Sequence, residues 1–519
     1  MKTTGRMLRG VLACMVGAGL TLVTSAAEPR KVPGEKFFTE PTLRTFDFQI
    51  GEPELEQLRR ASRTYVHATV REGDRLLTNV AVRLKGMGSF RPVDEKPSLA
   101  VKFDEFTDHK YRGLSKLMFN NSAQDRTYLA EMLATQMFRD AGLPAARSTH
   151  ARVRLNGRDL GLYVVFEAVN KDFLAQHFSD ATGNLYETYV ADIDGRVEQD
   201  HGADRSQADV QALNRACNIA DPTARWAELN RLLDVDRFVS FAAMEMLTSH
   251  WDGYVIHTNN FRLYHEPSSD KFQFITHGID WAFRRPNIYV FQPPKALVAR
   301  AVLGTPEGQR LYRQRVGMLF TNVFRVPVIT NRMEAALAKI RRAGLSNSQM
   351  ADVERRAVWL REQIETRAAR VSEQLRGLEP SPLRFDGDGV AVLDKWRDEP
   401  DRGEPVMKRG PFDGRDALHI GARDERTRAS WRSQVYLPAG RYRFEGQARM
   451  ALTSGSARLR ISGDTRSYGL GGTGTAWRPL VHEFVIAAPG MDVEFVCELN
   501  ANGGDVWFDL GSLRVRQMP

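Results

Sequence analysis

The sequence contains few cysteines, with only Cys14, Cys217 and Cys497 among its 519 residues. Cys14 lies in the leader described below, and the other two fall in different expected domains. We therefore expect two buried free thiols and no disulfide framework. No group of His, Cys or acidic residues has the spacing of a zinc site, because the histidines are scattered along the chain. These absences exclude a small domain held together by disulfides or by a structural metal.

The sequence also lacks a basic run interleaved with aromatic residues. Its formal net charge is +9, but arginine and lysine are spread along the chain. This distribution is typical of a solvated surface, and we expect no nucleic-acid partner. Beyond the leader no stretch is apolar enough to cross a bilayer, so we expect no integral membrane segment once the leader is removed.

The leader, residues 1–27, has the layout of a secretory signal peptide. Three basic residues precede an apolar run at 11–23, and small residues follow at 25–27. The run is too short and wrongly flanked for a stable membrane span. We therefore predict a mature protein that is secreted, periplasmic or on the cell surface.

The rest of the chain divides into regions of different composition. At 519 residues with 42% hydrophobic content, two domains with their own cores are expected. Residues 28–44 are polar and are interpreted as an N-terminal arm, and residues 45–379 mix strand and helix patterns. Prolines and glycines then interrupt the chain. Residues 383–519 show short strands separated by turns, which predicts an all-β sandwich.

The centre of the chain predicts a β-hairpin between two aspartates. Strand patterns at 260–265 and 271–275 flank a polar turn, and an aspartate lies on either side of the pair. Carboxylate and amide oxygens gathered at one end of such a hairpin suit Mg²⁺ and a polyphosphate. The side chains expected at that end are Asp252, Asp280 and either Asn259 or Asn260.

The order Asp, Asn, hairpin, Asp is the layout of a protein-kinase catalytic segment. The match is one of layout only. The His-Arg-Asp triplet is absent, the spacing is looser, and Trp281 follows Asp280 where the familiar motif has Phe-Gly. On layout alone, a structural hairpin that carries these three polar residues by chance is a better interpretation than a catalytic segment.

Features of a nucleotide-binding lobe precede the hairpin. A strand ends in a turn at 86–89 that contains two glycines, and Lys102 lies in a strand pattern soon after. Backbone N–H groups of such a turn can approach phosphates, and a strand lysine can neutralise them. Lys85 and Lys96 compete with Lys102 for this role.

The segment 125–140 predicts an amphipathic helix that ends before Gly142. Glu131 lies off its apolar stripe, so it either pairs with the strand lysine or is simply exposed. An Asn-Gly turn at 156–157 then predicts a second hairpin. Glu167 follows that hairpin and would lie near a hinge between two lobes.

Taken in order, these segments resemble the spore coat protein H (CotH) kinase family over about residues 45–377. The resemblance rests on RLKGMGSF with KPSLAVKF, RVRLNGRDLGLYVVFEAVNKDFL, GNLYE, and HWDGY with NNFRLY and FITHGIDWAF. It implies an α+β chain, with an atypical, bilobal protein-kinase-like domain followed by the sandwich. It also implies transfer of the ATP γ-phosphate to Ser or Thr of a secreted or surface protein, with Mg²⁺, or Mn²⁺ in its place.

The resemblance also implies roles for single residues. Asp252 corresponds to the catalytic aspartate, Asp280 to the metal-binding aspartate, and Asn260, or its neighbour Asn259, to the metal-site asparagine. The family often has Arg where this chain has Lys85, and Lys where it has Glu187, so the identity of the phosphate-binding lysine stays open. The candidates for nucleotide binding are Lys102, Lys85, Gly86, Gly88, Ser89, Glu131 and Glu167.

The C-terminal region resembles the jelly-roll carbohydrate-binding modules, which implies a glycan as a further partner. Candidate sugar-stacking residues are Trp396, Trp431, Tyr468 and Trp477, although such residues more often pack a core. The alternative to an exported kinase is a non-catalytic surface or coat-type protein, in which the kinase-like fold is a scaffold and the sandwich binds glycan.

Overall fold

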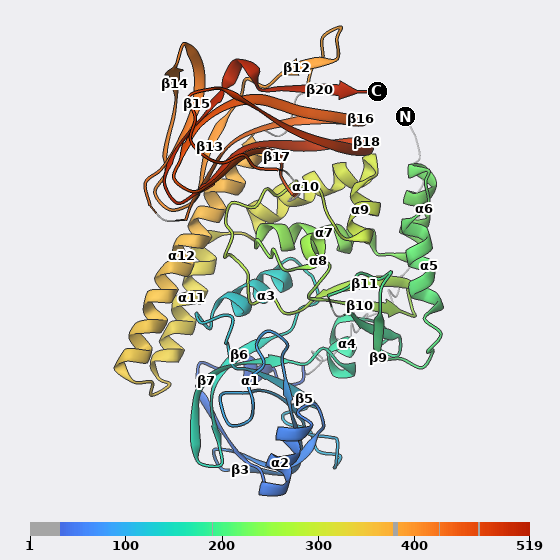
Figure 1. The fold of residues 1–519 in the computed structure, drawn as a ribbon. Helices are drawn as coiled ribbons and strands as arrows, with labels where there is room; N and C mark the ends of the chain where they lie inside the picture. Colours follow the sequence, from blue (N-terminus) through green and yellow to red (C-terminus); the bar gives the residue numbers. More distant parts are fainter. Residues whose placement is uncertain (1–31, 189, 377–381, 425, 465–467) are drawn as a thin grey trace, which may run out of the picture.

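The computed structural model describes residues 32–188, 190–376, 382–424, 426–464 and 468–519 (Figure 1). The predicted signal peptide and Cys14 lie outside these ranges, as does the stretch 377–381 in which the first domain was expected to end. The fold is a mixture of helices and strands, in the order β-barrel, helical body with a small sheet, and C-terminal β body. Within these ranges, none of the helices combines the length and the apolar character needed to cross a membrane.

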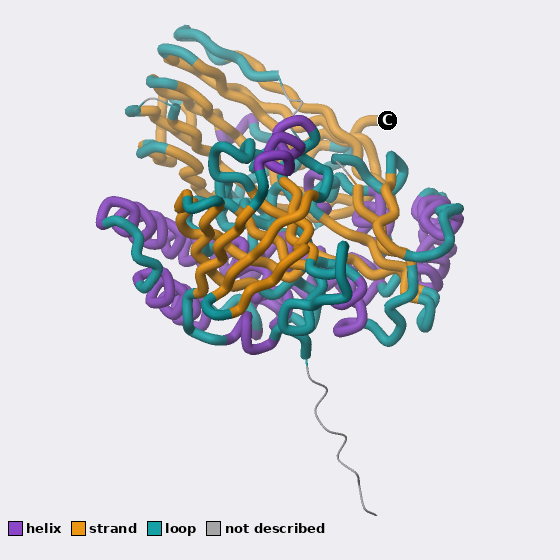
Figure 2. Tube along the Cα trace, turned by 90° about the horizontal axis from the view of Figure 1, so that it is seen from below, coloured by secondary structure: helices purple, strands orange, loops and turns teal. Residues whose placement is uncertain are grey.

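The N-terminal body is a closed seven-stranded barrel, which faces the viewer in Figure 2. Strand β2 alternates buried and exposed positions, so that Val66, Ala68 and Val70 point into the barrel. Strands β1 and β6 close it in parallel, and all its other pairs are antiparallel. The order around the barrel is β1 (Arg44–Gln49), β2 (Val66–Glu72), β3 (Arg75–Lys85), β4 (Ser98–Lys102), β5 (Lys116–Asn120), β7 (Arg158–Glu167) and β6 (Ser148–Leu155).

Part of the segment interpreted as a polar arm belongs to the packing of the barrel. Helix α1 (Glu35–Thr39) buries Phe37, whose ring packs edge-on against Phe46 and Tyr111 in the barrel core. Helix α2 (Glu52–Arg60) follows β1. The sequence does not indicate this packing, because a short segment with one buried aromatic residue shows no periodic pattern of apolar residues.

Helix α3 (Ala130–Asp140) begins later than the predicted start at residue 125. The Asp125 carboxylate accepts the backbone N–H of Thr127, and the Thr127 hydroxyl accepts the N–H groups of Leu129 and Ala130. These side chains form a turn that caps the helix, because Asp and Thr compete with helical backbone hydrogen bonds.

The second body contains the predicted central hairpin, which is confirmed with strands β10 (Phe261–Glu266) and β11 (Lys271–Thr276). They form a four-stranded sheet with β8 (Asn184–Thr188) and β9 (Val197–His201). Helix α7 (Val235–Leu247) is buried from Phe238 to its end. The other helices are α4 (Lys171–His177), α5 (Ala208–Cys217), α6 (Pro222–Leu232), α8 (Tyr254–His257), α9 (Leu297–Leu303), α10 (Pro306–Asn322), α11 (Val326–Arg341) and α12 (Asn347–Arg376).

A buried arginine of α12 fixes the segments on both sides of the hairpin. Arg367 has no exposed surface, and it donates to the carbonyls of Met246 and Leu247 at the end of α7. It also donates to the carbonyls of Pro286 and Ile288, after Asp280. A buried guanidinium must find such acceptors, so α12 holds both loops in place.

The C-terminal body is all-β, as predicted, but two of its strands are far longer than expected. Prolines and glycines that usually mark turns instead lie within the two strands, where Pro438 pairs with Gly490 and Gly440 with Ile486 across a register shift. They form an irregularity within one long strand pair. The strands are β12 (Val390–Val392), β13 (Arg397–Arg402), β14 (Val406–Phe412), β15 (Arg415–Ala422), β16 (Thr427–Leu452), β17 (Gly455–Ile461), β18 (Arg478–Ala501), β19 (Gly504–Asp509) and β20 (Arg514–Met518).

The C-terminal body lies directly on helices α10 and α12 (Figure 1). The Gln309 side chain of α10 donates to the Gly490 carbonyl at 2.5 Å. The Arg370 Nε of α12 lies 3.2 Å from the Glu399 Oε1, and the Glu399 side chain is fully buried. Cys217 and Cys497 are free and buried, as the sequence predicted.

Candidate functional site

The loop that carries Asp252 is fixed by a buried glutamate at the end of α7. The Glu245 carboxylate has no exposed surface and accepts the backbone N–H groups of Tyr254 at 2.9 Å and Val255 at 2.8 Å. A Cβ at Gly253 would lie 2.5 Å from Glu245 Oε1, so only glycine fits after Asp252. The position of Asp252 is therefore set by the end of a buried helix.

Asn260 connects Asp252 to the hairpin. Its side-chain Nδ2 donates to the Asp252 carbonyl at 2.9 Å and to Asp252 Oδ2 at 3.0 Å. A Cβ at Gly278 would lie 2.5 Å from Asn260 Oδ1, so the amide oxygen lies against the backbone that leads to Asp280. Of the two asparagines left open by the sequence, the structure places Asn260 rather than Asn259 against Asp252.

Asp280 lies within electrostatic reach of Asp252, on the far side of the hairpin. Burial, together with Asp125 and Asp252, raises the pKa of Asp280 to about 7, while His250 and Lys85 oppose the rise. The Gln124 side-chain amide can donate to Asp280 Oδ2 at 3.1 Å. Asn260 is thus bonded to Asp252, and the Asp252 charge is near enough to affect Asp280.

Lys85 at the end of β3 lies among these acidic groups. Burial lowers the pKa of Lys85, whereas Glu131 and Asp280 favour its charged form. Glu131 of α3 is buried, and its carboxylate accepts a hydrogen bond from Asn120 Nδ2 at 2.9 Å. Burial and Asp280 raise the pKa of Glu131 to about 8, against the opposing effect of Lys85. The lysine, the glutamate and the aspartate, from three separate segments, thus lie within electrostatic reach of one another.

Lys102, the first lysine candidate from the sequence, lies elsewhere. In the β3–β4 register, Lys85 pairs with Ser98, whereas Lys102 pairs with Ala81 at the opposite end of the two strands. Lys102 forms an ion pair with Glu105. Of the lysines that the sequence leaves open, Lys102 thus lies at the end of the strands away from Lys85, because a sequence pattern does not fix which end of a strand faces the site.

The Lys96 ammonium group is already engaged by other groups of the barrel. Its Nζ donates to the Leu162 carbonyl at 2.8 Å and lies 5.0 Å from the centroid of the Tyr163 ring. These contacts are those of a structural lysine, held by a carbonyl and an aromatic face. Lys85 is thus the lysine that the structure places beside Asp280.

The glycine turn packs near the same acidic groups. Gly86 has φ 100°, and a Cβ there would lie 2.6 Å from Ser89 Oγ. A Cβ at Gly88 would lie 2.9 Å from Gln124 Nε2. The side-chain amide of Gln124 is the group that can donate to Asp280. Gly86, Gly88 and Ser89 therefore form a tight turn beside the site.

Glu167 lines the cavity between barrel and hairpin, together with Lys85, Glu131, Thr276 and Gly278. Its carboxylate is already engaged, since Arg147 Nε donates to Oε2 at 2.9 Å and Gln176 Nε2 donates to Oε1 at 2.8 Å. Glu167 thus lines the cavity with a carboxylate that is held by its neighbours.

Sequence reasoning missed Asp125, Gln124 and His250. The Asp125 carboxylate is buried and adds to the negative charge felt by Asp280. His250 is also buried, with Nδ1 3.6 Å from Glu245 Oε1, and within the described part of the chain neither of its ring nitrogens has a hydrogen-bond partner. The only signal for the first two was a polar run, NNSAQDRT, after a buried strand.

The candidate sugar-binding residues have different surroundings. Trp396 stacks on Phe444, and Trp431 is 7% exposed, so both belong to the core. The Arg415 guanidinium lies 4.8 Å from the Trp477 ring centroid and covers it. Tyr468 is 92% exposed.

A protein-family model described as CotH kinase protein matches residues 82–387 of the chain. The inner spore coat protein H of Bacillus subtilis is 22% identical over 293 residues, which cover 51% of this chain and 77% of that protein. Invasin CotH2 of Rhizopus delemar is 26% identical over 181 residues, 31% of this chain. The chain spans only 30% of the length of this invasin.

Two solved structures show weaker similarity. The Helicobacter pylori proinflammatory kinase CtkA is 8% identical with a TM-score of 0.29, over 56% of this chain and 96% of that chain. TmCBM61, solved with β-1,4-galactotriose, is 18% identical with a TM-score of 0.19, over 24% of this chain and 90% of that chain. Scores this low do not establish a shared overall fold.

Proposed function

The chain belongs to the CotH kinase family, and on that premise we propose that it is an atypical protein kinase. It would transfer the γ-phosphoryl group of Mg²⁺·ATP to a Ser or Thr hydroxyl of a secreted or surface protein. The observation that supports this proposal is that Asp252, bonded to Asn260, and Asp280 lie within electrostatic reach of each other, with Lys85 and Glu131 beside Asp280. Phosphoryl transfer needs little from a protein except positioning and charge stabilisation, and this set supplies both.

The residues present fit a divalent cation. Burial raises the pKa of Asp280 most, and the negative charges of Asp125 and Asp252 add to the rise, so a cation there would favour the ionised carboxylate. Mg²⁺ is commonly held by one or two carboxylates together with substrate phosphates and water. A complete protein cage is therefore not required, and the described residues contain no group of three His, Cys, Asp or Glu side chains that forms one.

Each residue then has one task. Asp280 and Asn260 would hold the metal ion, which supplies charge neutralisation at the phosphates when it is bound. Lys85, whose charged form Glu131 favours, would bind phosphate oxygens together with the N–H groups of the 86–89 turn. Asp252, oriented by Asn260, would align the acceptor hydroxyl and take its proton.

Radiolabel transfer from ATP to the exported proteins of the source cell tests the proposal. We expect Asp252→Asn and Asp280→Asn to reduce transfer by roughly 100-fold or more, with the thermal unfolding midpoint little changed. Asp108→Asn, at an exposed aspartate, is the control and should transfer like the wild type. Near-normal transfer by both site variants would refute the assignment. No Mg²⁺-dependent thermal shift with ATP in the wild type would instead favour the non-catalytic surface protein.

The proposal extends to export and to the C-terminal body. The sequence pattern at 1–27 supports a secreted or surface location, and the exposed ring of Tyr468 supports glycan binding by stacking. Retention on immobilised polysaccharides should fall for Tyr468→Ala and stay unchanged for Trp431→Phe, which alters a core residue. Equal retention of the wild type and Tyr468→Ala would show that this residue does not bind glycan.

A further inference from the structure

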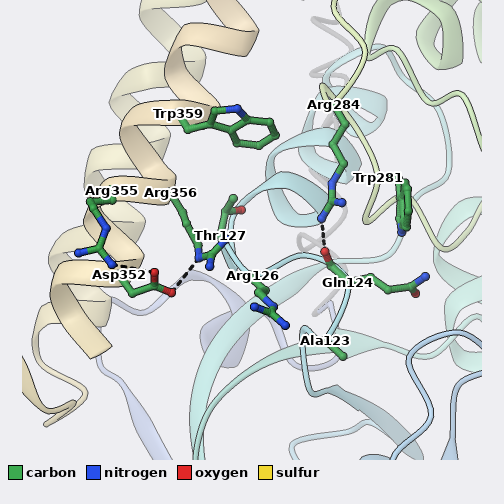
Figure 3. Close-up of a pocket in the computed structure, with 10 residues that line it drawn as sticks. All are labelled: Ala123, Gln124, Arg126, Thr127, Trp281, Arg284, Asp352, Arg355, Arg356 and Trp359. Carbon is green, nitrogen blue, oxygen red and sulfur yellow. Dashed lines mark hydrogen bonds and ion pairs between the residues drawn. The ribbon is translucent and has the colours of Figure 1, made fainter. Parts of the chain in front are cut away.

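A pocket of about 680 Å³ lies beside the residue that follows Asp280 (Figure 3). Three segments that are distant in sequence form it: the turn 123–127 before α3, the loop 281–284 and helix α12. This volume is in the range of ligand sites. The site described above does not use this pocket.

The charge of the pocket is strongly positive. Four arginines and one carboxylate, Asp352, line it. The Asp352 carboxylate accepts hydrogen bonds from two of these arginines. Arg355 Nη2 donates to Oδ1 at 3.0 Å, and Arg356 Nε donates to Oδ2 at 2.8 Å. Among the described residues, the exposed Arg126 has no ion pair or hydrogen bond through its side chain. The pocket thus holds more guanidinium groups than its own carboxylate can satisfy, which favours an anionic occupant.

Two tryptophans add apolar surface to this charge. The Trp281 ring forms one wall, with the Arg284 guanidinium 4.6 Å from its centroid, and Trp359 of α12 lies across the pocket (Figure 3). Trp359 is 39% exposed, which is unusual for so large a ring. Guanidinium forks beside aromatic faces suit a polypeptide that carries both carboxylates and apolar side chains.

The pocket is connected to the catalytic residues by direct contacts. The Trp281 and Trp251 rings pack edge to face at 5.0 Å, and Trp251 precedes Asp252 in the chain. On the other side, Arg284 donates to the Gln124 carbonyl, and the Gln124 amide lies 3.1 Å from Asp280 Oδ2. A chain bound in the pocket would therefore lie next to the place where the acceptor hydroxyl must meet Asp252.

We propose that this pocket binds an acidic segment of the acceptor protein, and that it directs phosphorylation to Ser or Thr residues with Asp or Glu nearby in sequence. The inference rests on the proposed kinase function, for which it names the substrate class. The arginines would pair with the acidic side chains through charge-assisted, bidentate hydrogen bonds. Lys85 and the 86–89 turn remain for the nucleotide.

The test compares a serine peptide rich in Glu with the same peptide carrying Gln in place of Glu. In the wild type we expect kcat/KM at least roughly tenfold higher for the Glu peptide, mainly through a lower KM. The double variant Arg126→Gln/Arg356→Gln should lose this preference and keep wild-type kcat/KM on the Gln peptide. Arg361→Gln, on α12 but outside the pocket, is the matched control and should behave like the wild type.

Direct binding separates this inference from the kinase proposal. Fluorescence anisotropy of the labelled Glu peptide, without nucleotide, should show salt-sensitive binding that is lost in the double variant and kept in Arg361→Gln. Binding that follows this pattern without transfer to either peptide would overturn the kinase function but support the pocket. Equal binding, or an equal Glu preference, in wild type and double variant would overturn the pocket assignment.

Discussion

The side-chain amide of Asn260 donates to both the backbone carbonyl and the carboxylate of Asp252, at 2.9 Å and 3.0 Å. Asn260 begins the hairpin and Asp252 lies in the loop before it, so this pair fixes the loop to the sheet. Asp280 leaves the other end of the same hairpin. The distance between the two aspartates is therefore determined by paired strands and not by a flexible connection.

Gly278→Ala tests how closely Asn260 must approach the Asp280 backbone. Gly278 has φ 56°, and the new Cβ would lie 2.5 Å from Asn260 Oδ1. We expect phosphoryl transfer to fall by roughly tenfold or more, because Asn260 must move away from Asp252. Steady-state kinetics will show the effect, and Gly317→Ala, in helix α10 with open space around it, is the control. Unchanged kinetics in Gly278→Ala would mean that Asn260 does not set the geometry.

Lys85→Met tests the assignment of the nucleotide lysine against Lys102→Met. Lys85 is partly buried and lies within electrostatic reach of Glu131 and Asp280, so its removal should abolish the Mg²⁺-dependent thermal shift with ATP and lower transfer by roughly 100-fold. Lys102 pairs with Glu105 in a partly exposed position and should be replaceable without effect on either measurement. The opposite result, with Lys102→Met inactive and Lys85→Met active, would reverse the assignment.

His150 should make the stability of the barrel depend on pH. Burial lowers the pKa of His150 to about 4, while its hydrogen bond to the Tyr128 carbonyl opposes this shift. An unfolded histidine titrates near a pKa of about 6.5, so below that pH the unfolded chain binds a proton that the folded chain does not. Stability from this residue is complete at pH 7 and is lost as the pH falls toward 4.

The expected loss from His150 between pH 7 and pH 5 is about 2 kcal/mol. Urea titrations of the wild type and of His150→Gln at both pH values will measure it, because glutamine can still donate to Tyr128 but does not titrate. The variant should lose less stability than the wild type over this interval. An identical loss in both proteins would show that His150 is not the titrating group.

Glu399→Gln tests whether the C-terminal body stabilises the rest of the chain. The Glu399 carboxylate is fully buried between Arg370 of α12 and Arg397, at 3.2 Å and 2.5 Å. Removal of its charge takes one carboxylate from each of these arginines, which keep only Glu373 and Glu494 as partners, and it leaves a neutral amide at a fully buried position, at a cost of about 3 kcal/mol. Thermal unfolding followed by circular dichroism should show a lower midpoint for the variant.

Glu373→Gln is the matched control for this prediction. Glu373 also binds Arg370, at 3.1 Å, but its side chain is 39% exposed. An exposed pair is worth less than about 1 kcal/mol, so the midpoint should hardly move. Equal midpoints for Glu399→Gln and the wild type would show that the two bodies are not coupled through α12.

The sequence by itself determined the features that depend on local periodicity. The alternation of apolar and polar residues, with a polar turn, is enough to predict β10 and β11 and hence the order Asp252, Asn260, Asp280. Helix α3 follows from the apolar spacing at 125–140, although it begins later, and the change to strands after residue 383 marks an all-β body. These patterns are local because each helix or strand must bury one face of its own.

Only the tertiary structure decided which residues meet. Lys85 rather than Lys102 reaches Asp280 because the β3–β4 register places them at opposite ends of the strands, and register is a property of pairing between segments. Asp125 and Gln124 join the site through the packing of a turn that has no sequence periodicity. The long pair β16–β18 also escaped prediction, since proline and glycine that usually mark turns here lie opposite one another within a sheet. Contacts between distant segments are set by packing of the whole chain, and local patterns do not encode them.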